Sequence, residues 1–195
     1  MALTRNDLLS LEEYSDQRNE FRKKVMAHKA NRRLHIGEHV ALYFESKLTM
    51  QYQIQEMLRI EKIFDAAGIQ EELDAYNPLI PNGNGWRATM MLEYVDPEQR
   101  KRCLAELKGI EDTLWFGTDK QGKRRFTPKV NPDLERSTEE KTSAVHFVFW
   151  DFTEEEKKEI LAAKQWYFGI DHPNYGPISV LVDGSLKVEL EKEIG

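Results

Sequence analysis

The stretch that decides the fold is AVHFVFWDFTEEEKKEILAAKQWYFGI, at residues 144–170. Its two ends, 144–152 and 166–170, are short runs rich in aromatic and aliphatic side chains, which is typical of buried strands. Between them Thr153 precedes Glu156 by three residues, a capping box that predicts a helix over 154–164. With a further strand at 178–182, this region predicts a strand–helix–strand–strand (βαββ) unit.

A similar unit lies upstream. It comprises a strand at 88–94, a helix at 97–108 that Asp96 caps, and strands at 113–118 and 124–127. In both units the strand after the helix contains Phe-Gly-x-Asp, at 116–119 and at 168–171. An internal duplication would place two similar units side by side, with a cleft at their junction. Chance similarity between two ordinary α+β stretches gives the same pattern, and the sequence leaves both explanations open.

The first eighty residues are mainly helical. Ser10 and Glu13 form a capping box before a helix over 11–31, and alternation around Gly37 predicts a hairpin over 34–44. A long helix follows over 47–67, and Gly68 is expected to end it before a shorter helix at 71–76. The loop residues between Asn77 and Gly85 then separate a region at 1–80 from a sheet region at 81–195. We expect the two regions to form one compact domain.

The whole pattern predicts an α+β fold. Its parts are an N-terminal helix and β-hairpin, a long central helix, and a mainly antiparallel sheet built from two βαββ-like units. Apolar and charged residues alternate from 186 to 194, through Leu186, Val188 and Leu190, which predicts an edge strand at the C-terminus.

The composition is that of a folded protein without a dominant basic surface. The 195 residues are 40% hydrophobic and 32% charged, with a net charge of −6. This balance indicates a soluble protein and argues against general nucleic-acid binding. No run of about 18 apolar residues predicts a membrane span. Cys103 is the single cysteine, so no intrachain disulfide is expected, and with a polar N-terminus we expect a cytoplasmic location.

The segment from His35 to His39 matches the H-x-x-E-H pattern of one class of zinc peptidases. That chemistry needs a helix, because only there do two histidines four residues apart face the same zinc ion. Here Gly37 interrupts the segment and strand-type alternation flanks it. The pattern therefore predicts a hairpin and no peptidase site.

The long helix carries polar residues beside its apolar stripe. Glu61 falls on that stripe, where a carboxylate facing a core must be paired, protonated or ligated. Glu56 and Arg59 are three residues apart and can pair on the neighbouring face, with Gln53 one turn before them. One interpretation is a polar pocket lined by Gln53, Glu56 and Arg59. The other is a half-exposed helix whose charges pair at its edge.

Two histidines are candidate ligand-binding or acid–base groups. His146 lies within a strand of apolar residues, so it is either a buried, hydrogen-bonded histidine or a poised acid, base or ligand. His172 directly follows a strand end, where functional residues are common. The long helix lacks the Glu-x-x-His of a di-iron carboxylate site. The sequence therefore assigns no metal and no cofactor.

Four groups of residues carry a family resemblance: LTR at 3–5 with LEEY at 11–14, MQYQIQEMLR at 50–59, EELDAYNPLIP at 71–81 and TSAVHF at 142–147. On these strings the chain resembles, from end to end, the bacterial family of unknown function numbered 3501 among the domains so labelled. The family has no established activity, so the resemblance assigns no catalytic residue. It implies genes near rubrerythrin-like and iron–sulfur proteins, and hence a link to peroxide or oxygen stress.

Three functional hypotheses follow. The first is an accessory protein in an oxidative-stress or iron-related system, which binds a small ligand or a partner such as a redox or iron–sulfur protein; this rests mainly on the resemblance. The second is a small-molecule enzyme whose acid–base cleft combines His146, His172, Glu56 and Arg59, and it requires these side chains to converge. The third is a structural dimerisation module, and a homo-oligomer is compatible with all three.

Overall fold

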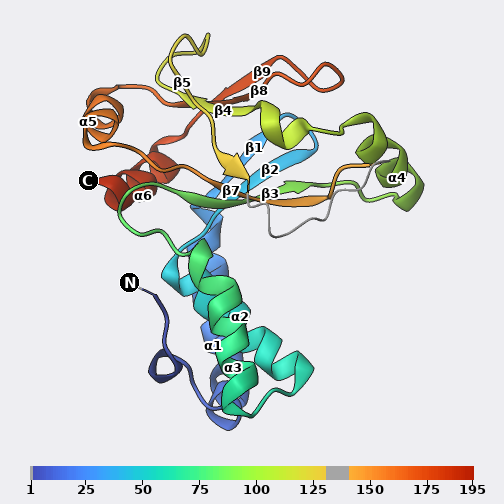
Figure 1. Cartoon of the computed structure of the whole chain (residues 1–195), viewed down its shortest axis with the longest axis vertical. Coiled ribbons are helices and arrows are strands. Elements are labelled where there is room, and N and C mark those ends of the chain that lie inside the picture. The colour runs from blue at the N-terminus through green and yellow to red at the C-terminus, as the bar shows by residue number, and fades with distance from the viewer. Residues whose placement is uncertain (1, 131–140) are drawn as a thin grey trace.

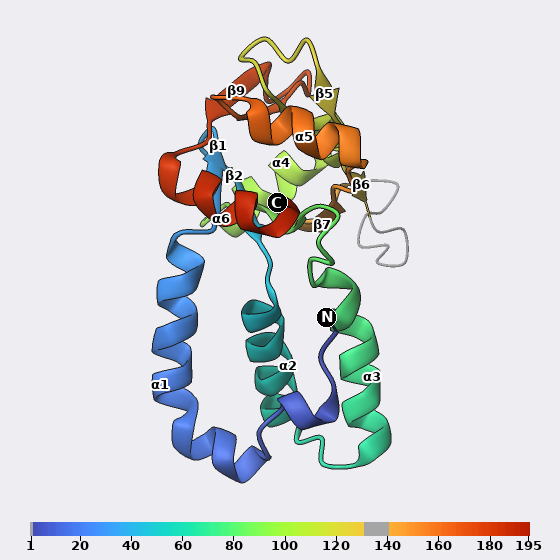
Figure 2. The ribbon, with the colours of Figure 1, turned by 90° about the vertical axis from the view of Figure 1, so that its left-hand side faces the viewer.

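The computed structural model describes residues 2–130 and 141–195. Two antiparallel sheets enclose the main core, and three helices extend as an arm from the outer side of the first sheet (Figures 1 and 2). The predicted α+β fold is confirmed. No helix within the described ranges combines the length and the apolar character that crossing a membrane requires.

The first sheet has the order β1-β2-β3-β7-β6. The predicted hairpin is confirmed: Ile36 lies opposite Val40, and Gly37 adopts a φ of +74° in the turn, a conformation that glycine reaches without strain. The hairpin joins the later strands because β2 pairs with β3, with Tyr43 opposite Thr89. The strands are Arg33–Ile36, Val40–Phe44, Arg87–Leu92, Val145–Phe149 and Lys129–Val130.

The second sheet has the order β5-β4-β8-β9. The two Phe-Gly-x-Asp segments meet at its centre, where Phe116 lies opposite Phe168 and Trp115 opposite Gly169. A Cβ atom at Gly169 would overlap the Trp115 indole, which explains the glycine. The two βαββ units are thus paired in both sheets, β3 with β7 and β4 with β8. The strands are Arg125–Phe126, Leu114–Gly117, Tyr167–Ile170 and Ile178–Leu181.

Aromatic side chains fill the core between the sheets. The Trp86 and Phe116 rings meet edge to face with centroids 4.8 Å apart, and both residues are fully buried. The three tryptophans of this core each donate their indole N–H to a backbone carbonyl, so no polar cost offsets this packing. The pairs are Trp86 with Leu190, Trp150 with Phe126 and Trp166 with Ile160.

Helices α4 (Pro97–Glu106), α5 (Glu154–Ala162) and α6 (Gly184–Ile194) complete this part of the molecule, with the short 3₁₀ turn η3 (Ile110–Thr113). The prediction of a C-terminal edge strand is wrong, because that segment is helix α6. Asp183 caps it by accepting a hydrogen bond from the Leu186 N–H. Leu190 is buried four residues after Leu186, whereas Val188 is 49% exposed, so the apolar spacing is helical.

The arm consists of α1 (Leu11–Ala30), α2 (Lys47–Glu61) and α3 (Ala66–Tyr76). The capping box predicted at the start of α1 is confirmed. The prediction that Gly68 ends the long helix is wrong: α2 ends at Glu61, and Gly68 lies in the first turn of α3. There Asp65 accepts hydrogen bonds from the Ala67 and Gly68 N–H groups. A Cβ atom at Gly68 would lie 2.6 Å from Cγ2 of Ile63, so close packing is what requires the glycine.

The segment before α1, which includes the 3₁₀ turn η1 (Arg5–Asp7), runs along the arm and is held by side-chain amides. Gln55 is fully buried; its Oε1 accepts from the Leu9 N–H at 2.6 Å and its Nε2 donates to the Leu9 carbonyl at 3.3 Å. Asn77, at the start of η2 (Asn77–Leu79), binds both backbone groups of Leu3 in the same way, at 2.7 and 2.9 Å. These paired amides replace the strand partner that the segment lacks.

Candidate functional site

A pocket of about 350 Å³ lies between the outer face of the first sheet and the helical arm. We call it the sheet pocket. Strand alternation creates it: Met90 and Val148 point into the core, and their neighbours point outward to form its base. The lining residues are Tyr43, Glu45, Thr89, Met91 and Phe147 from the sheet and the residue after β2, and Met26, Lys29, Met50, Gln53, Tyr76 and Leu79 from the arm.

The distinctive group in this pocket is the carboxylate of Glu45, which is 5% exposed. Its two oxygens each accept one hydrogen bond at 2.6 Å, one from the hydroxyl of Thr49 on α2 and one from the hydroxyl of Thr89 on β3. Among the described residues no cation pairs with it within 4.0 Å. A carboxylate oxygen can accept more than one hydrogen bond, so Glu45 keeps acceptor capacity toward the pocket.

Glu45 is fixed in place by its backbone. Its N–H donates to the Arg87 carbonyl at 2.8 Å, which extends the pairing of β2 with β3 by one residue. Its carbonyl accepts from the buried Arg32 guanidinium at 3.0 Å. Ser46 then caps α2 by accepting from the Thr49 N–H, and the chain turns into the arm. The carboxylate is therefore placed by a strand end and a helix start together.

Arg32 also binds the C-terminal helix. It is 3% exposed and forms ion pairs with Glu189 and Glu193 of α6. Burial raises the pKa of the Glu193 carboxyl to about 7, although the charge of Arg32 acts in the opposite direction. One oxygen of Glu193 is buried and has no hydrogen-bond partner among the described residues. Arg32 thus links α6 to the backbone of the residue that supplies the pocket's carboxylate.

The remaining surface of the sheet pocket is mainly apolar, with three methionines, two tyrosines and a phenylalanine. Methionine side chains are flexible and polarisable, so they adapt to ligands of different shape. The Tyr43 hydroxyl is already bound, donating to Glu93 at 2.6 Å, and burial raises the pKa of this phenol. Lys29 and Gln53 are only half-buried and add hydrogen-bond donors to the pocket.

The predicted pair of Glu56 and Arg59 is present, with 3.2 Å between Arg59 Nη2 and Glu56 Oε2, but it belongs to a larger cluster. Arg18 of α1 binds Glu56 through two hydrogen bonds, of 2.7 and 2.8 Å, and the Tyr14 hydroxyl donates to it at 2.6 Å. The Arg18 hydrogen bonds are the main reason that the pKa of Glu56 falls to about 2. Burial raises the pKa of Tyr14. The Arg18 and Tyr14 contacts join α1 to α2, whereas the Arg59 pair lies within α2.

The other predicted helix residues lie apart from this cluster. Gln53 lines the sheet pocket, as described, so it does not share a pocket with Glu56 and Arg59. Glu61 is the last residue of α2 and is exposed, contrary to the expectation of a carboxylate facing a core. The reason is that α2 ends there, so the apolar stripe stops at Leu58.

The two candidate histidines occupy separate, hydrogen-bonded positions. His146 is 6% exposed, and its Nε2 lies 2.9 Å from the Ser143 carbonyl and 3.1 Å from the Thr142 hydroxyl. The His172 ring accepts from the Asn174 N–H at Nδ1, so its Nε2 carries the proton that binds the Lys108 carbonyl at 3.1 Å. Neither ring contacts Glu56 or Arg59 in these hydrogen bonds. Both histidines support local loops.

The H-x-x-E-H segment lies across the β1–β2 turn, as predicted, and not on a helix. His39 stacks on Tyr94 with centroids 4.2 Å apart, and its Nδ1 lies 3.1 Å from the Glu93 carbonyl. Within residues 2–130 and 141–195, no group of three or more His, Cys, Asp or Glu side chains is arranged to hold a metal ion.

Comparison with known proteins places this fold in a family. The family model described as a protein of unknown function, DUF3501, matches residues 2–194. The chain belongs to this family. The resemblance noted from the sequence is therefore confirmed. A search of curated proteins finds no match.

One solved structure gives the same fold over the whole DUF3501 chain. It is the crystal structure of a protein of unknown function from Burkholderia pseudomallei, which is 43% identical. The match covers 100% of both chains with a TM-score of 0.91. The three arm helices and both sheets are thus shared by a relative whose function is also unknown.

Sequence reasoning did not identify Glu45, Thr89 or Arg32 as site residues. Glu45 stands between a strand and a helix cap, where an acidic residue is unremarkable. The signal available was weak: in the VALYFES segment the apolar run of β2 passes directly into a charged residue before the Ser46 cap. The Thr89 hydroxyl and Arg32 reach Glu45 only because separate elements pack together, and no local pattern shows that.

Proposed function

We propose that this protein is a binding protein whose sheet pocket takes a small organic molecule with an apolar body and a protonated amine. The observation that supports this most is the Glu45 carboxylate, 5% exposed and without an ion-pair partner among the described residues, in a pocket of otherwise mainly apolar walls. A buried carboxylate of this kind gains most from a cationic hydrogen-bond donor.

The size and walls of the pocket define the body of the ligand. A volume of about 350 Å³ lies near the lower end of the range for small-molecule sites. Phe147 and the methionines Met50 and Met91 offer flat and adaptable contact to an aromatic or short aliphatic group. Lys29 and Gln53 can donate to an acceptor elsewhere on the ligand.

The experiment compares amines with their neutral counterparts. Phenethylamine and 2-phenylethanol are titrated into the full chain and followed by methyl NMR shifts of the pocket methionines. We expect the amine to bind more tightly, and Glu45→Gln to weaken amine binding about tenfold or more while leaving the alcohol unchanged. The matched control is Glu38→Gln, a carboxylate that is 87% exposed in the hairpin turn. Equal binding of the two compounds, or no effect of Glu45→Gln, would overturn the proposal.

The cellular setting rests on the family resemblance alone. We propose that the bound ligand or a partner protein connects this chain to an oxidative-stress or iron-related system, with a redox or iron–sulfur protein as partner. Pulldown from the native host, with metal analysis of the purified protein, tests this. A preparation that never recovers a redox partner and carries no iron would refute it, without affecting the amine-binding proposal.

A further inference from the structure

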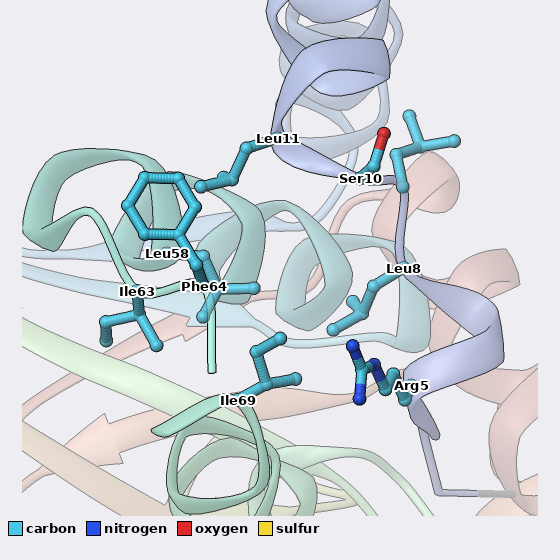
Figure 3. Close-up of a pocket in the computed structure, with 9 residues that line it drawn as sticks. Arg5, Leu8, Ser10, Leu11, Leu58, Ile63, Phe64 and Ile69 are labelled. Carbon is cyan, nitrogen blue, oxygen red and sulfur yellow. The ribbon is translucent and has the colours of Figure 1, made fainter. Parts of the chain in front are cut away.

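A second pocket lies at the far tip of the arm, and it shares no lining residue with the sheet pocket. We call it the tip pocket. Its volume is about 310 Å³. Three segments form it: the chain before α1, the end of α2 with the loop that follows, and the first turn of α3. Figure 3 shows Leu8, Leu11, Ile63 and Ile69 around a common hollow, with the Arg5 side chain at its edge.

The walls of the tip pocket are almost entirely aliphatic. Leu58 is buried at its base, while Leu8, Leu11 and Ile69 are half-buried. Phe64 covers one side and leaves 70% of its surface exposed. This much apolar surface facing a hollow gains free energy when a ligand removes it from water, at about 25 cal/mol per Å². An apolar chain is the chemistry that suits such walls.

Of the described lining residues, Ser10 and Arg5 carry polar side chains, and of these two only Arg5 is available to a ligand. The Ser10 hydroxyl is engaged with Glu13, at 2.8 Å from the carboxylate and 3.2 Å from the N–H, in the capping box of α1. The Arg5 guanidinium forms no hydrogen bond or ion pair with any described residue. The nearby Asp7 is bound to Lys47 at 2.9 Å and to Thr4, so it does not neutralise Arg5.

Among the residues that the structure describes, Arg5 is the cation without a partner at the edge of this apolar hollow, and that combination selects for an anionic amphiphile. We propose that the tip pocket binds an aliphatic carboxylate of medium chain length, with the chain between Leu8, Ile63 and Ile69 and the carboxylate on Arg5. The guanidinium is suited to this because its planar N–H groups can bind both oxygens of a carboxylate. The bound chain would also cover the exposed face of Phe64.

The pocket is held in shape independently of the ligand. Gln55 fixes Leu9 through both of its backbone groups, so the segment carrying Arg5 and Leu8 is anchored next to the wall. Asp65 caps α3 beneath Ile69, and Gly68 allows Ile63 to pack against the helix backbone. A site that exists before binding loses less conformational entropy when the ligand enters.

The test compares decanoate with decanol and decyltrimethylammonium on the full chain, each below its aggregation concentration. Binding is followed by methyl NMR shifts of Leu8, Ile63 and Ile69. We expect decanoate to bind about fivefold more tightly than decanol, and the cation to bind most weakly. Arg5→Gln should make decanoate and decanol equal, and Arg5→Lys should restore part of the difference. The matched control is Arg22→Gln, an exposed arginine of α1 outside this pocket.

A variant that fills the tip pocket tests whether the ligand binds there. Ile69→Phe should weaken both decanoate and decanol, because the larger ring occupies the hollow; circular dichroism confirms that this variant is folded. Equal binding of the three compounds, or binding that Ile69→Phe does not change, would overturn the proposal. So would a concentration-dependent dimer that Phe64→Ser dissociates, since the tip would then be an interface between two copies. Binding of the chain to lipid vesicles through Phe64, with no affinity for free decanoate, would overturn it as well.

Discussion

Replacing Glu193 with glutamine should make the stability of this protein less dependent on pH. The carboxyl is buried beside Arg32, and one of its oxygens has no hydrogen-bond partner among the described residues. Desolvation raises its pKa from 4.5 to about 7, against the attraction of Arg32 and Arg87. The ionised form is therefore less stable in the folded protein than in the unfolded chain. Glutamine has nearly the same shape and no charge to desolvate.

The sign and size of the effect follow from these two pKa values. Below pH 4.5 both states are protonated, and the carboxyl contributes no pH dependence. Between pH 4.5 and 7 the unfolded chain loses its proton while the folded protein retains it, so the free energy of unfolding falls as pH rises. Above pH 7 the full effect is present. At about 1.4 kcal/mol per pKa unit, it amounts to about 3 kcal/mol.

Urea unfolding at a series of pH values, followed by tryptophan fluorescence, measures this directly. From pH 4.5 to above 7 the wild-type free energy of unfolding should fall by about 3 kcal/mol more than that of Glu193→Gln. Glu189→Gln is the matched control, because Glu189 pairs with the same arginine but hydrogen bonding to Lys192 lowers its pKa. It should keep most of the wild-type dependence in this range, because the charge of Glu189 is only a minor cause of the raised pKa of Glu193. Identical pH profiles for wild type and Glu193→Gln would show that Arg32 holds this carboxylate ionised, and the reasoning would fail.

Two further substitutions test the packing that positions the pockets. Gly169→Ala should destabilise the protein by about 1–3 kcal/mol, because the new methyl group overlaps the Trp115 ring; thermal unfolding no different from that of the wild type would contradict it. Gln55→Leu should cost about 1–3 kcal/mol, since it leaves the two backbone groups of Leu9 without their partners. Faster hydrogen exchange at the Leu9 amide should accompany that loss, and unchanged exchange would argue against the anchoring role.

Local chemistry was enough to predict most elements. The capping residues Ser10, Asp96 and Thr153 each begin a helix in the structure, and the alternation around Gly37 is a hairpin. The two wrong predictions of elements, the C-terminal edge strand and the helix end at Gly68, came from sequence patterns that fit more than one structure. Alternation at 186–194 satisfied a strand pattern and a helix pattern together, and burial of every fourth residue decided for the helix. Gly68 resembled a helix breaker until its contact with Ile63 gave another reason for it.

The candidate pockets could not be predicted from the sequence. Gln53 was identified as a polar residue of the long helix, but its pocket also depends on two distant strands. Strand 87–92 pairs with the hairpin, and strand 145–149 pairs with strand 87–92. Glu45 was not identified at all, because its partner Thr89 is 44 residues away along the chain. Likewise Arg5 lies at a pocket only because α3 returns beside the N-terminal segment.

The amino-acid sequence by itself determined the α+β class, the helix starts, the hairpin and the family, because caps, turns and hydrophobic periods act over a few neighbouring residues. The tertiary structure alone decided which face of the first sheet the arm covers, and hence that Glu45 faces an apolar pocket. It also decided that Glu56 serves to join two helices. Whether a side chain is buried, and which groups it contacts, depends on elements far apart in the chain. The effect of a charged side chain is therefore set by the groups that surround it in the folded protein.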